Sequence, residues 1–553
     1  MPLRRWLPFL SWPRPSARLL RGEALAGLTV GLMVIPQGVA YAALAGMPLV
    51  TGIYASLLPA LVAVLFGASQ RLSVGPTALS CLLVTASLSG LAAPGSAAWV
   101  ALAVWLALLT GLLQVVLGAV RFGWLLNLVN APVLMAFTQG AAVLIVGSQL
   151  PPMLGLQGGW SGLWSAPPQV HWPALAFGAG SAALLVLARR WKPTFPTVLL
   201  LVLASAGLSH WSGFEANGGA VVGALPQGLP ALYWPTWPGW ATLGQLVVPV
   251  LVITLVSFLE TASSAKVDNA RQGQRWDQDQ DLIGQGLAKL AAGLTGTFPT
   301  SSSFSRSALN LYAGAQTGWA TVFSVGVVLA ALLLFLPVLH HVPHAVLAAI
   351  VLVAVVGLIQ PREFVRLWHI SRVEAVTASA TFAITLLTAP RLYWGVLAGV
   401  LMALSHFLYL RLHPRIIEVG WHSDGRLRDR HLWQLPPLAP ATLALRMDAE
   451  LDFGSASALE RSLSEHLAQQ PETRHVLLLA QPINRIDATG VETFGRLRRQ
   501  LANQQRHLWL VGVKLPVETV LRQAGELPDT AHLHLHATEA EALMALEKLD
   551  ARR

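Results

Sequence analysis

The chain has 553 residues, of which 54% are hydrophobic and only 12% are charged. A soluble protein carries about 25% charged residues, so this composition excludes a wholly soluble globular protein. The formal net charge of +10 fits the basic bias of cytoplasmic loops, and we expect no nucleic-acid partner because Arg-rich segments with interleaved aromatics are absent. Cys81 is the only cysteine, which excludes an intrachain disulfide and a cysteine-based metal site.

The N-terminal segment, residues 1–22, is rich in arginine and proline. It lacks the uninterrupted apolar core that a signal peptide has. We interpret it as a cytoplasmic lead-in that lies at the membrane surface.

Long apolar runs with very few basic residues follow, and they predict membrane spans. The fourteen expected spans cover residues 23–42, 49–67, 75–90, 97–119, 124–150, 171–189, 195–210, 243–266, 281–297, 303–315, 317–339, 343–359, 373–389 and 391–411. If the N-terminus is cytoplasmic, every cytoplasmic loop of this count holds basic residues, and the outer loops hold only Arg391. The sequence therefore predicts a transmembrane domain over residues 23–415, in the inner (plasma) membrane, with both ends in the cytoplasm.

Two spans are interrupted by proline-marked polar runs, at Ser73–Ala78 and at Phe298–Asn310. The third span enters from the cytoplasm and the tenth from outside, so each helix would begin part-way across and the two helix N-termini would face each other. Unpaired N–H groups and the positive dipole end at each N-terminus suit an anion. Broken helices in matching halves are typical of secondary transporters. Two ordinary proline kinks are the alternative.

Four sequence blocks carry a resemblance to a known family: Val34-Ile-Pro-Gln-Gly-Val-Ala-Tyr41, Gly52-Ile-Tyr-Ala-Ser56, Val74-Gly-Pro-Thr-Ala78 and the run from Phe298 to Asn310. Together they resemble the signature blocks of the sulfate permease family (SulP, or solute carrier family 26), in order and over almost the whole chain. The resemblance implies an α-helical polytopic membrane protein with fourteen spans in a 7+7 inverted repeat. Spans 1–4 and 8–11 would form a core domain, and spans 5–7 and 12–14 a gate domain. It also implies homodimers that carry anions.

The resemblance further implies a substrate site built from the first, third and tenth spans, with the residues Gln37, Tyr41, Thr77, Ala78, Ser305 and Arg306. Gln37 and Tyr41 are four residues apart and share one helix face. The amide of Gln37 can donate hydrogen bonds to an anion, and Tyr41 can supply a ring wall or a hydroxyl. Interhelical hydrogen bonding and packing are the alternative roles of this pair.

Glu260 lies inside the eighth apolar span, where an acidic residue is a functional candidate. Ser257 and Ser264 give its helix a polar face. In the family this position is associated with coupling to protons or sodium, so we assign Glu260 and Ser264 to coupling. Protonation of Glu260 would remove a charge that repels an incoming anion, whereas a structural ion pair with Arg306 is the alternative. Lys289 departs from the small polar residue expected in the ninth span; it either alters the electrostatics near Glu260 or snorkels.

No cofactor and no metal site are expected. The histidines at span ends and in outer loops lack the chain spacing of metal ligands and are interpreted as interfacial: His171, His340, His341 and His344.

After an expected linker, residues 416–439, the tail over residues 440–553 alternates strands and helices, which predicts a small cytoplasmic α/β domain. Its Ile486-Asp-Ala-Thr-Gly490 loop resembles the signature loop of STAS domains. In soluble relatives a hydroxyl of that loop is phosphorylated, and Thr489 is the only hydroxyl left here. We favour a role of Thr489 as a helix N-cap over regulation.

The leading interpretation is a secondary active transporter of sulfate-like inorganic or small carboxylate anions, proton-coupled, with elevator-type alternating access and no bond chemistry. A bicarbonate or dicarboxylate carrier or an anion exchanger of the same family is the alternative. A nucleobase carrier shares the fold, and a voltage-responsive motor or an uncoupled channel is a further variant. A membrane-tethered sensor that signals through the STAS domain is an alternative of another class. The expected partners are a small anion, a proton or sodium ion, membrane lipid and a second copy of the chain.

Overall fold

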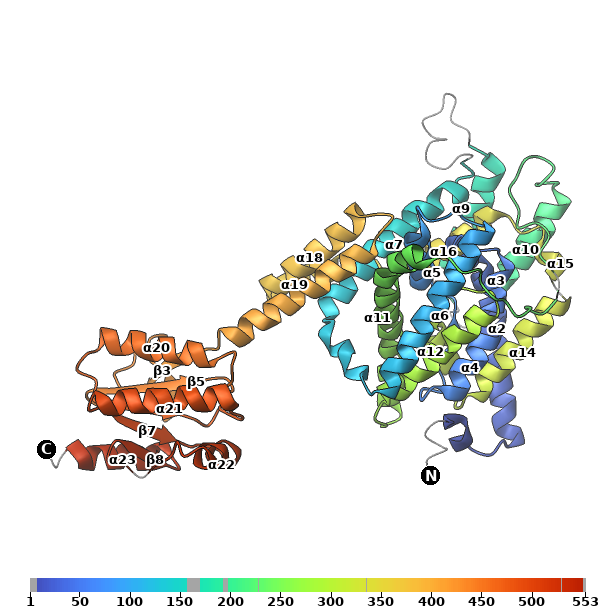
Figure 1. Cartoon of the computed structure of the whole chain (residues 1–553). Helices are drawn as coiled ribbons and strands as arrows, with labels where there is room; N and C mark the ends of the chain where they lie inside the picture. The colour runs from blue at the N-terminus through green and yellow to red at the C-terminus, as the bar shows by residue number, and fades with distance from the viewer. Residues whose placement is uncertain are drawn as a thin grey trace. The chain divides into compact units, whose positions relative to one another are not determined.

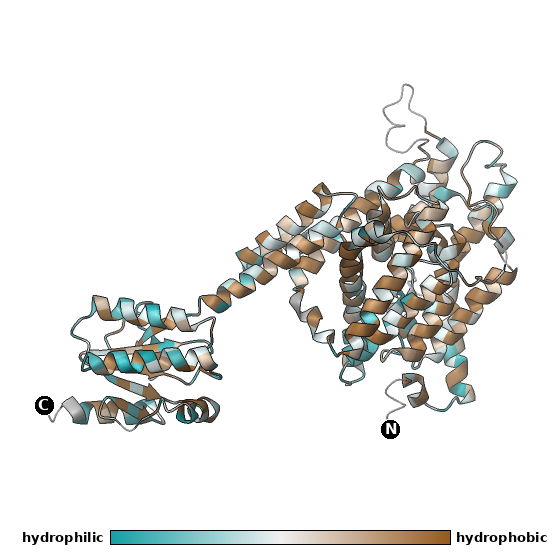
Figure 2. Ribbon diagram, in the orientation of Figure 1, coloured by the Kyte–Doolittle hydropathy of each residue, from teal (hydrophilic) through white to brown (hydrophobic). Residues whose placement is uncertain are grey.

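The computed structural model describes residues 7–156, 170–191, 197–226, 228–334, 336–528 and 530–550. It divides into two compact units, Met1–Ala403 and Leu404–Arg553 (Figure 1). Hydrophobic residues dominate the helices of the first unit, and hydrophilic residues are common on those of the second (Figure 2).

The first unit consists of helices and two short strands. Its first half contains η1 (Pro8–Ser11), α2 (Ala17–Leu44), α3 (Val50–Tyr54), α4 (Leu58–Phe66), β1 (Val74–Gly75), α5 (Ala78–Leu88), α6 (Ala97–Ala119), η2 (Gly123–Leu128), α7 (Ala131–Met153), α9 (Trp172–Trp191) and α10 (Thr197–Trp211). Its second half contains α11 (Trp240–Arg271), α12 (Gln278–Leu294), β2 (Ser301–Ser302), α13 (Phe304–Tyr312), α14 (Trp319–Leu334), α15 (Leu336–Leu339), α16 (His344–Val356), α17 (Arg362–Ile370), α18 (Arg372–Leu387) and α19 (Tyr393–Leu412), which continues into the second unit.

Each of the fourteen expected spans contains a helix. Among the described residues, five helices (α2, α6, α7, α11 and α19) are long and apolar enough to cross a membrane by themselves. Several of the other apolar segments form shorter helices of 10–17 residues, as expected where a span is broken part-way. Helix α17 was not expected: where we predicted a loop, it is an amphipathic helix without buried residues, as is typical of helices that lie at a membrane surface.

The helices of the first unit pack mainly in two groups. Helices α2, α4, α6, α11, α12 and α14 contact one another, and helices α7, α9, α10, α16 and α18 form a second set of contacts. Small residues permit the closest approaches: a Cβ added to Gly111 of α6 would lie 2.7 Å from the backbone oxygen of Gly286 in α12. Glycine contacts of this kind are common in membrane helix packing. The two groups correspond to the expected core and gate divisions.

The second unit is an α/β domain. Its six-stranded sheet has the order β4-β3-β5-β6-β7-β8, in which β5 to β8 are parallel and β3 is antiparallel to both of its neighbours. The strands are β3 (Ile416–Trp421), β4 (Leu427–Asp429), β5 (Thr442–Met447), β6 (His475–Leu479), β7 (His507–Val511) and β8 (Leu533–His536). The helices are α20 (Ala456–Gln469), α21 (Ala488–Asn503), α22 (Leu515–Gln523) and α23 (Glu539–Asp550).

Alternate residues of the strands face two apolar cores, as a pleated sheet requires. Leu443 and Leu445 belong to the core that includes α20, α21 and α22, whereas Ala444 and Trp509 belong to the core that includes α23. Every strand and helix expected between residues 443 and 524 is present. The expected linker, residues 416–439, is a correction: it supplies β3 and β4. Ile417 and Val419 of β3 belong to the core that includes α23, and Ile417 pairs with Arg446 of β5.

Candidate functional site

Two short strands bring the broken helices together. Val74 pairs with Ser302 and Gly75 with Ser301 in an antiparallel ladder between β1 and β2. Each strand leads into a helix: two residues separate β1 from α5, and one residue separates β2 from α13. Since the strands are antiparallel, the two helices leave the ladder in opposite directions with their N-termini close together. The expected pair of facing helix starts is therefore present, and neither segment is a continuous span.

Local sequence explains both helix starts. A residue before proline avoids the helical conformation, which keeps Gly75 and Phe298 extended before Pro76 and Pro299. The hydroxyl of Thr77 accepts a hydrogen bond from Ser80 N–H and caps α5. Ser303 caps α13 in the same way through the N–H of Arg306. Both caps leave the remaining first-turn N–H groups of each helix available to a ligand.

Arg306 places a buried positive charge beside this ladder. Its side chain is 1% exposed, and its Nε donates a long hydrogen bond of 3.4 Å to Ser73 Oγ. Its Nη2 has no hydrogen-bond partner among the described residues, and it lies 3.3 Å from the position that a Cβ on Gly75 would occupy. A guanidinium buried without full pairing is costly unless an anion accompanies it.

Glu260 of α11 contacts the start of α5. Its Oε2 accepts hydrogen bonds from Thr77 Oγ1 at 3.2 Å and from Ser80 Oγ at 3.4 Å. Arg306 lies within electrostatic range of this carboxylate, but the two side chains form no ion pair in the described structure. The alternative of a structural ion pair is therefore not realised. The hydroxyl of Ser80 was not predicted to belong to the site, because nothing in its sequence context distinguishes it from other small residues of the span.

The expected pair on the first span also lies near these groups. Gln37 and Tyr41 of α2 are buried, and Tyr41 lies within electrostatic range of both Arg306 and Glu260. The amide oxygen of Gln37 has no hydrogen-bond partner in the described part of the chain. An amide oxygen accepts hydrogen bonds, so the group of Gln37 that could donate to an anion is its amide nitrogen.

Three of the predicted residues have other surroundings. Ser305 is exposed, and its Oγ lies 3.3 Å from Ser303 Oγ. Ser264 donates its hydroxyl to the carbonyl of Glu260 at 3.3 Å, one helical turn away on the same helix. Ala78 is half-buried at the first position of α5. Ala78 and Ser305 both lie in the first turn of their helices, whereas Ser264 lies inside α11.

Lys289 is fully buried on α12 and does not snorkel, in contrast to one of the two expectations for it. Its Nζ donates to Gln114 Oε1 at 2.9 Å. The amide nitrogen of Gln114 in turn donates to Ser257 Oγ and to the carbonyl of Thr254, each at 3.0 Å. Lys289 is thus tied to the helix that carries Glu260, and it interacts electrostatically with that carboxylate. The unit contains two buried cations near one acidic side chain.

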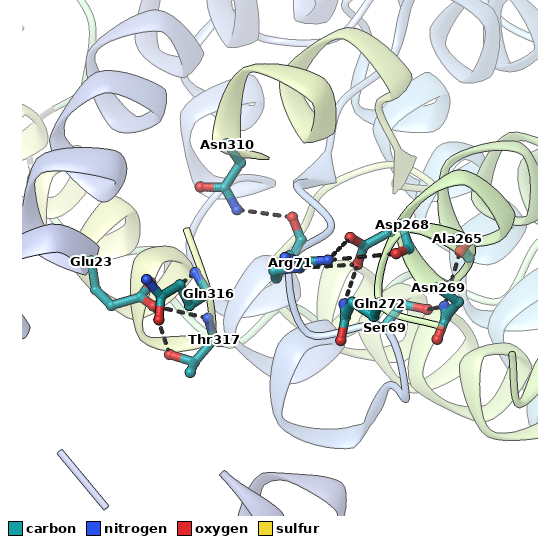
Figure 3. A network of polar contacts seen from close by, with 10 residues as sticks. All are labelled: Glu23, Ser69, Arg71, Ala265, Asp268, Asn269, Gln272, Asn310, Gln316 and Thr317. Carbon is teal, nitrogen blue, oxygen red and sulfur yellow. Dashed lines mark hydrogen bonds and ion pairs between the residues drawn. The ribbon is translucent and has the colours of Figure 1, made fainter. Parts of the chain in front are cut away.

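Two further groups of polar contacts, one around Arg71 and one around Glu23, lie near the ends of core helices (Figure 3). Arg71 forms an ion pair with the buried Asp268 of α11, and Asn310 of α13 donates to the carbonyl of Arg71 at 2.8 Å. Glu23 of α2 accepts from the N–H groups of Gln316 and Thr317 at 2.9 and 2.8 Å. Arg71 and Asp268 satisfy each other's charge, and the other side chains use backbone partners, so we interpret these contacts as structural.

The predicted N-cap in the signature loop of the tail is also corrected. Asp487, not Thr489, is the N-cap of α21, and its carboxylate accepts from Gly490 N–H at 2.8 Å. The same carboxylate accepts from Phe453 N–H at 3.0 Å, so it also fixes the loop before α20. Aspartate takes the cap because it precedes the first helical residue, whereas Thr489 is the second helical residue and is exposed.

Histidines gather on the sheet of the tail. His475 and His507 are opposite each other on β6 and β7, and His507 Nδ1 lies 3.1 Å from His534 Nε2 on β8. Burial and the neighbouring histidines lower the pKa of His534 to about 4. His534 is therefore neutral near pH 7.

Comparisons with known proteins agree with this geometry. The profile of the Sulfate permease family matches residues 20–381, and that of the STAS domain matches residues 437–542. A probable sulfate transporter of Mycobacterium tuberculosis is 32% identical over 555 residues, which cover 98% of each chain. The chain belongs to the sulfate permease family. The relatives are transporters, which supports a non-enzymatic role at the level of the family.

Solved structures support the fold. The murine solute carrier 26 family member A9 anion transporter, in its inward-facing state, superposes with a TM-score of 0.88 at 19% identity, covering 99% of this chain and 94% of that chain. The transmembrane domain of a cyanobacterial bicarbonate transporter superposes with a TM-score of 0.60 at 22% identity, covering 70% of this chain and 98% of that chain. The expected family, the polytopic helical fold and the STAS tail are thereby confirmed.

Proposed function

We propose that this sulfate permease family member is a secondary active transporter that binds a sulfate-like anion between the starts of α5 and α13. The observation that carries the proposal is the buried guanidinium of Arg306, whose Nη2 has no partner in the described structure. An anion would supply the missing negative charge, and the free N–H groups of the two helix starts would add hydrogen bonds. Gln37 and Tyr41 would complete the wall of the site, with Thr77, Ala78 and Ser305 at the helix starts.

Glu260 is proposed as the coupling residue. Hydrogen bonds to Thr77 and Ser80 hold the carboxylate of Glu260 close to the start of α5. When Glu260 is ionised, its charge therefore repels an anion that approaches this helix start. When it is protonated, that repulsion disappears and the carboxyl group can still bond to the same hydroxyls. Proton binding and anion binding would therefore favour each other.

Coupling to a proton is favoured over coupling to sodium by Lys289. Its buried ammonium group already interacts electrostatically with Glu260, so a sodium ion at this carboxylate would meet a like charge. The chain of contacts through Gln114 to Ser257 holds that ammonium in place beside α11. Ser264 donates to a backbone carbonyl, and we propose that it shapes the helix around Glu260.

A sodium-replacement experiment tests this choice. In proteoliposomes with an inward proton gradient, we expect the initial rate of sulfate uptake to remain within about twofold when external sodium is replaced by N-methylglucamine, since a positive charge on Lys289 near Glu260 opposes a metal cation at that carboxylate. The control is the same replacement without a proton gradient. A sodium requirement in both conditions would contradict the choice of the proton.

A panel of anions tests the substrate. We expect sulfate to compete best, since the related bacterial protein is named a probable sulfate transporter and a compact tetrahedral dianion can accept hydrogen bonds from both helix starts and Arg306 at once. Bicarbonate is the main alternative, because one structural neighbour is a bicarbonate transporter. Small dicarboxylates are a further alternative. Binding of the protein to uracil but to none of these anions would refute the proposal.

We also propose the membrane orientation, the transport movement and the assembly of the protein. The basic loops favour an inner-membrane protein with a cytoplasmic N-terminus and a cytoplasmic tail. The separate packing of two helix groups supports movement of a core domain against a gate domain, which is elevator-type alternating access. A homodimer in the lipid bilayer is the expected assembly, with residues 1–22 as the lead-in, 23–415 as the transport domain and the tail as a support for assembly.

A further inference from the structure

Three metal-ligand side chains from distant parts of the sequence meet in the first unit. Glu215 follows α10, and His340 and His341 follow α15; these two helices lie at the end of the unit opposite the N-terminus (Figure 1). A carboxylate oxygen of Glu215 and one ring nitrogen of each histidine lie within 4.8 Å of one another. The interpretation of His340 and His341 as merely interfacial is therefore incomplete, because their partner lies more than a hundred residues away in the chain.

The distances suit a shared metal ion better than direct hydrogen bonds. His340 Nε2 and Glu215 Oε2 are 3.5 Å apart, which is long for a hydrogen bond between a ring nitrogen and a carboxylate. Two ligand atoms bound to one tetrahedral zinc ion at about 2.0–2.1 Å are separated by roughly 3.4 Å. The rings of His340 and His341 are adjacent, with centroids 4.7 Å apart.

The backbone that carries the two histidines is fixed. Residues 220–223 run beside residues 340–344, and the N–H of Gly223 donates to the carbonyl of His340 at 3.0 Å. Further backbone bonds on either side extend this short ladder, and the buried Val342 anchors it in the apolar interior. A site on such a ladder is held in place before a metal ion arrives.

Glu215 is fixed by its neighbour. Phe214 is buried and packs edge-on against Phe177 at a centroid distance of 5.0 Å. The carboxylate of Glu215 is itself 54% exposed, so an ion can reach it from solution. His210, at the end of α10, stacks near His341 with ring centroids 4.4 Å apart and stands next to the group.

We propose that Glu215, His340 and His341 form a zinc site at this end of the membrane unit. Imidazole nitrogen and carboxylate oxygen are a common ligand set for zinc, and three protein ligands leave a fourth position for water or for His210. Another group, Glu418 with His431 and His466, is less suitable, because Glu418 already forms an ion pair with Arg430.

The position of the site gives zinc a consequence for transport, and this consequence rests on the proposed function. Glu215 follows a helix of the gate group, whereas His340 and His341 lie in the connection from α14 and α15, on the core side, to α16 of the gate group. A metal ion that joins the two segments restrains the connection on which movement of the core depends. Zinc added at this face therefore slows uptake.

Zinc titration of the purified full-length chain tests the site. Zinc is expected to raise the melting temperature of the wild-type protein, and the substitutions Glu215→Gln and His341→Ala are each expected to weaken that effect by at least about tenfold in zinc concentration. The variant His369→Ala is the control, because His369 is an exposed residue of α17 outside the group. The tail site, if it binds zinc, contributes equally to all of these proteins.

Uptake measurements on the same variants test the consequence. Uptake with added zinc is compared with uptake in the presence of a metal chelator. Zinc is expected to slow anion uptake by the wild type and by His369→Ala, and to leave the uptake of Glu215→Gln and His341→Ala unchanged. Equal zinc titrations for wild type and site variants would overturn the site. Zinc binding at the site with equal uptake in zinc and in chelator would overturn the restraint. Failure of every anion to be transported would instead refute the proposed function, and the melting curves would still report on the site.

Discussion

Replacement of Arg306 by alanine is expected to lower the affinity for the transported anion by roughly 10- to 100-fold, which corresponds to the ~1.5–3 kcal/mol of a hydrogen bond to a charged group. The guanidinium is buried and incompletely paired beside the β1–β2 ladder, and in the proposed function a bound anion supplies the missing partner. Isothermal titration with sulfate measures the affinity, and uptake into proteoliposomes measures the transport that follows from it.

Two further variants separate charge from geometry. Arg306→Lys keeps the charge but loses the planar fork of donors, and we expect an affinity between those of wild type and Arg306→Ala. Arg362→Ala removes an exposed arginine from α17 and should bind the anion as the wild type does. Unchanged affinity in Arg306→Ala, with the protein still folded by its melting curve, would contradict the site.

Replacement of Glu260 by glutamine is expected to abolish the response to a proton gradient while anion binding persists. Glutamine keeps the size and the hydrogen-bonding capacity that Thr77 and Ser80 require, but it cannot exchange a proton. In the wild type, an inward gradient of one pH unit supplies about 1.4 kcal/mol for each proton carried. Sulfate uptake should therefore rise severalfold with the gradient in the wild type and stay level in Glu260→Gln.

The matched control for this change is Glu363→Gln, which neutralises a glutamate of α17 outside the site. It should retain the full response to the gradient. Anion counterflow without a gradient should proceed in Glu260→Gln, because the neutral side chain resembles the protonated state. Gradient-driven accumulation by Glu260→Gln equal to that of the wild type would show that the proton is carried elsewhere.

The helix breaks could be predicted from the sequence because each combines a proline with a polar run, at Pro76 and at Pro299. Proline alone does not break a helix here, since Pro36 and Pro249 lie inside α2 and α11. The strand-helix alternation of the tail was likewise visible in its hydrophobic periodicity. The cap of α21 was predicted wrongly, since a two-residue difference in the helix start decides between Asp487 and Thr489.

Other features depend on tertiary contacts that no local pattern encodes. The strand β4 has only three residues, and both β3 and β4 lie in a charged, proline-containing stretch that resembles a linker. Pairing with β5 makes β3 part of the sheet. The bond from Lys289 to Gln114 joins residues 175 positions apart. Without that contact, a lysine in an apolar span could equally well have reached the interface, as long basic side chains often do.

The central claim is that an anion lies between the starts of α5 and α13, next to Arg306. The most direct measurement is an experimental structure of the full-length protein with bound selenate, whose selenium atom is located by anomalous scattering. We predict a selenium peak within hydrogen-bonding reach of the Arg306 guanidinium and of the first N–H groups of both helices. A peak elsewhere in the protein, with this position occupied only by water, would contradict the account.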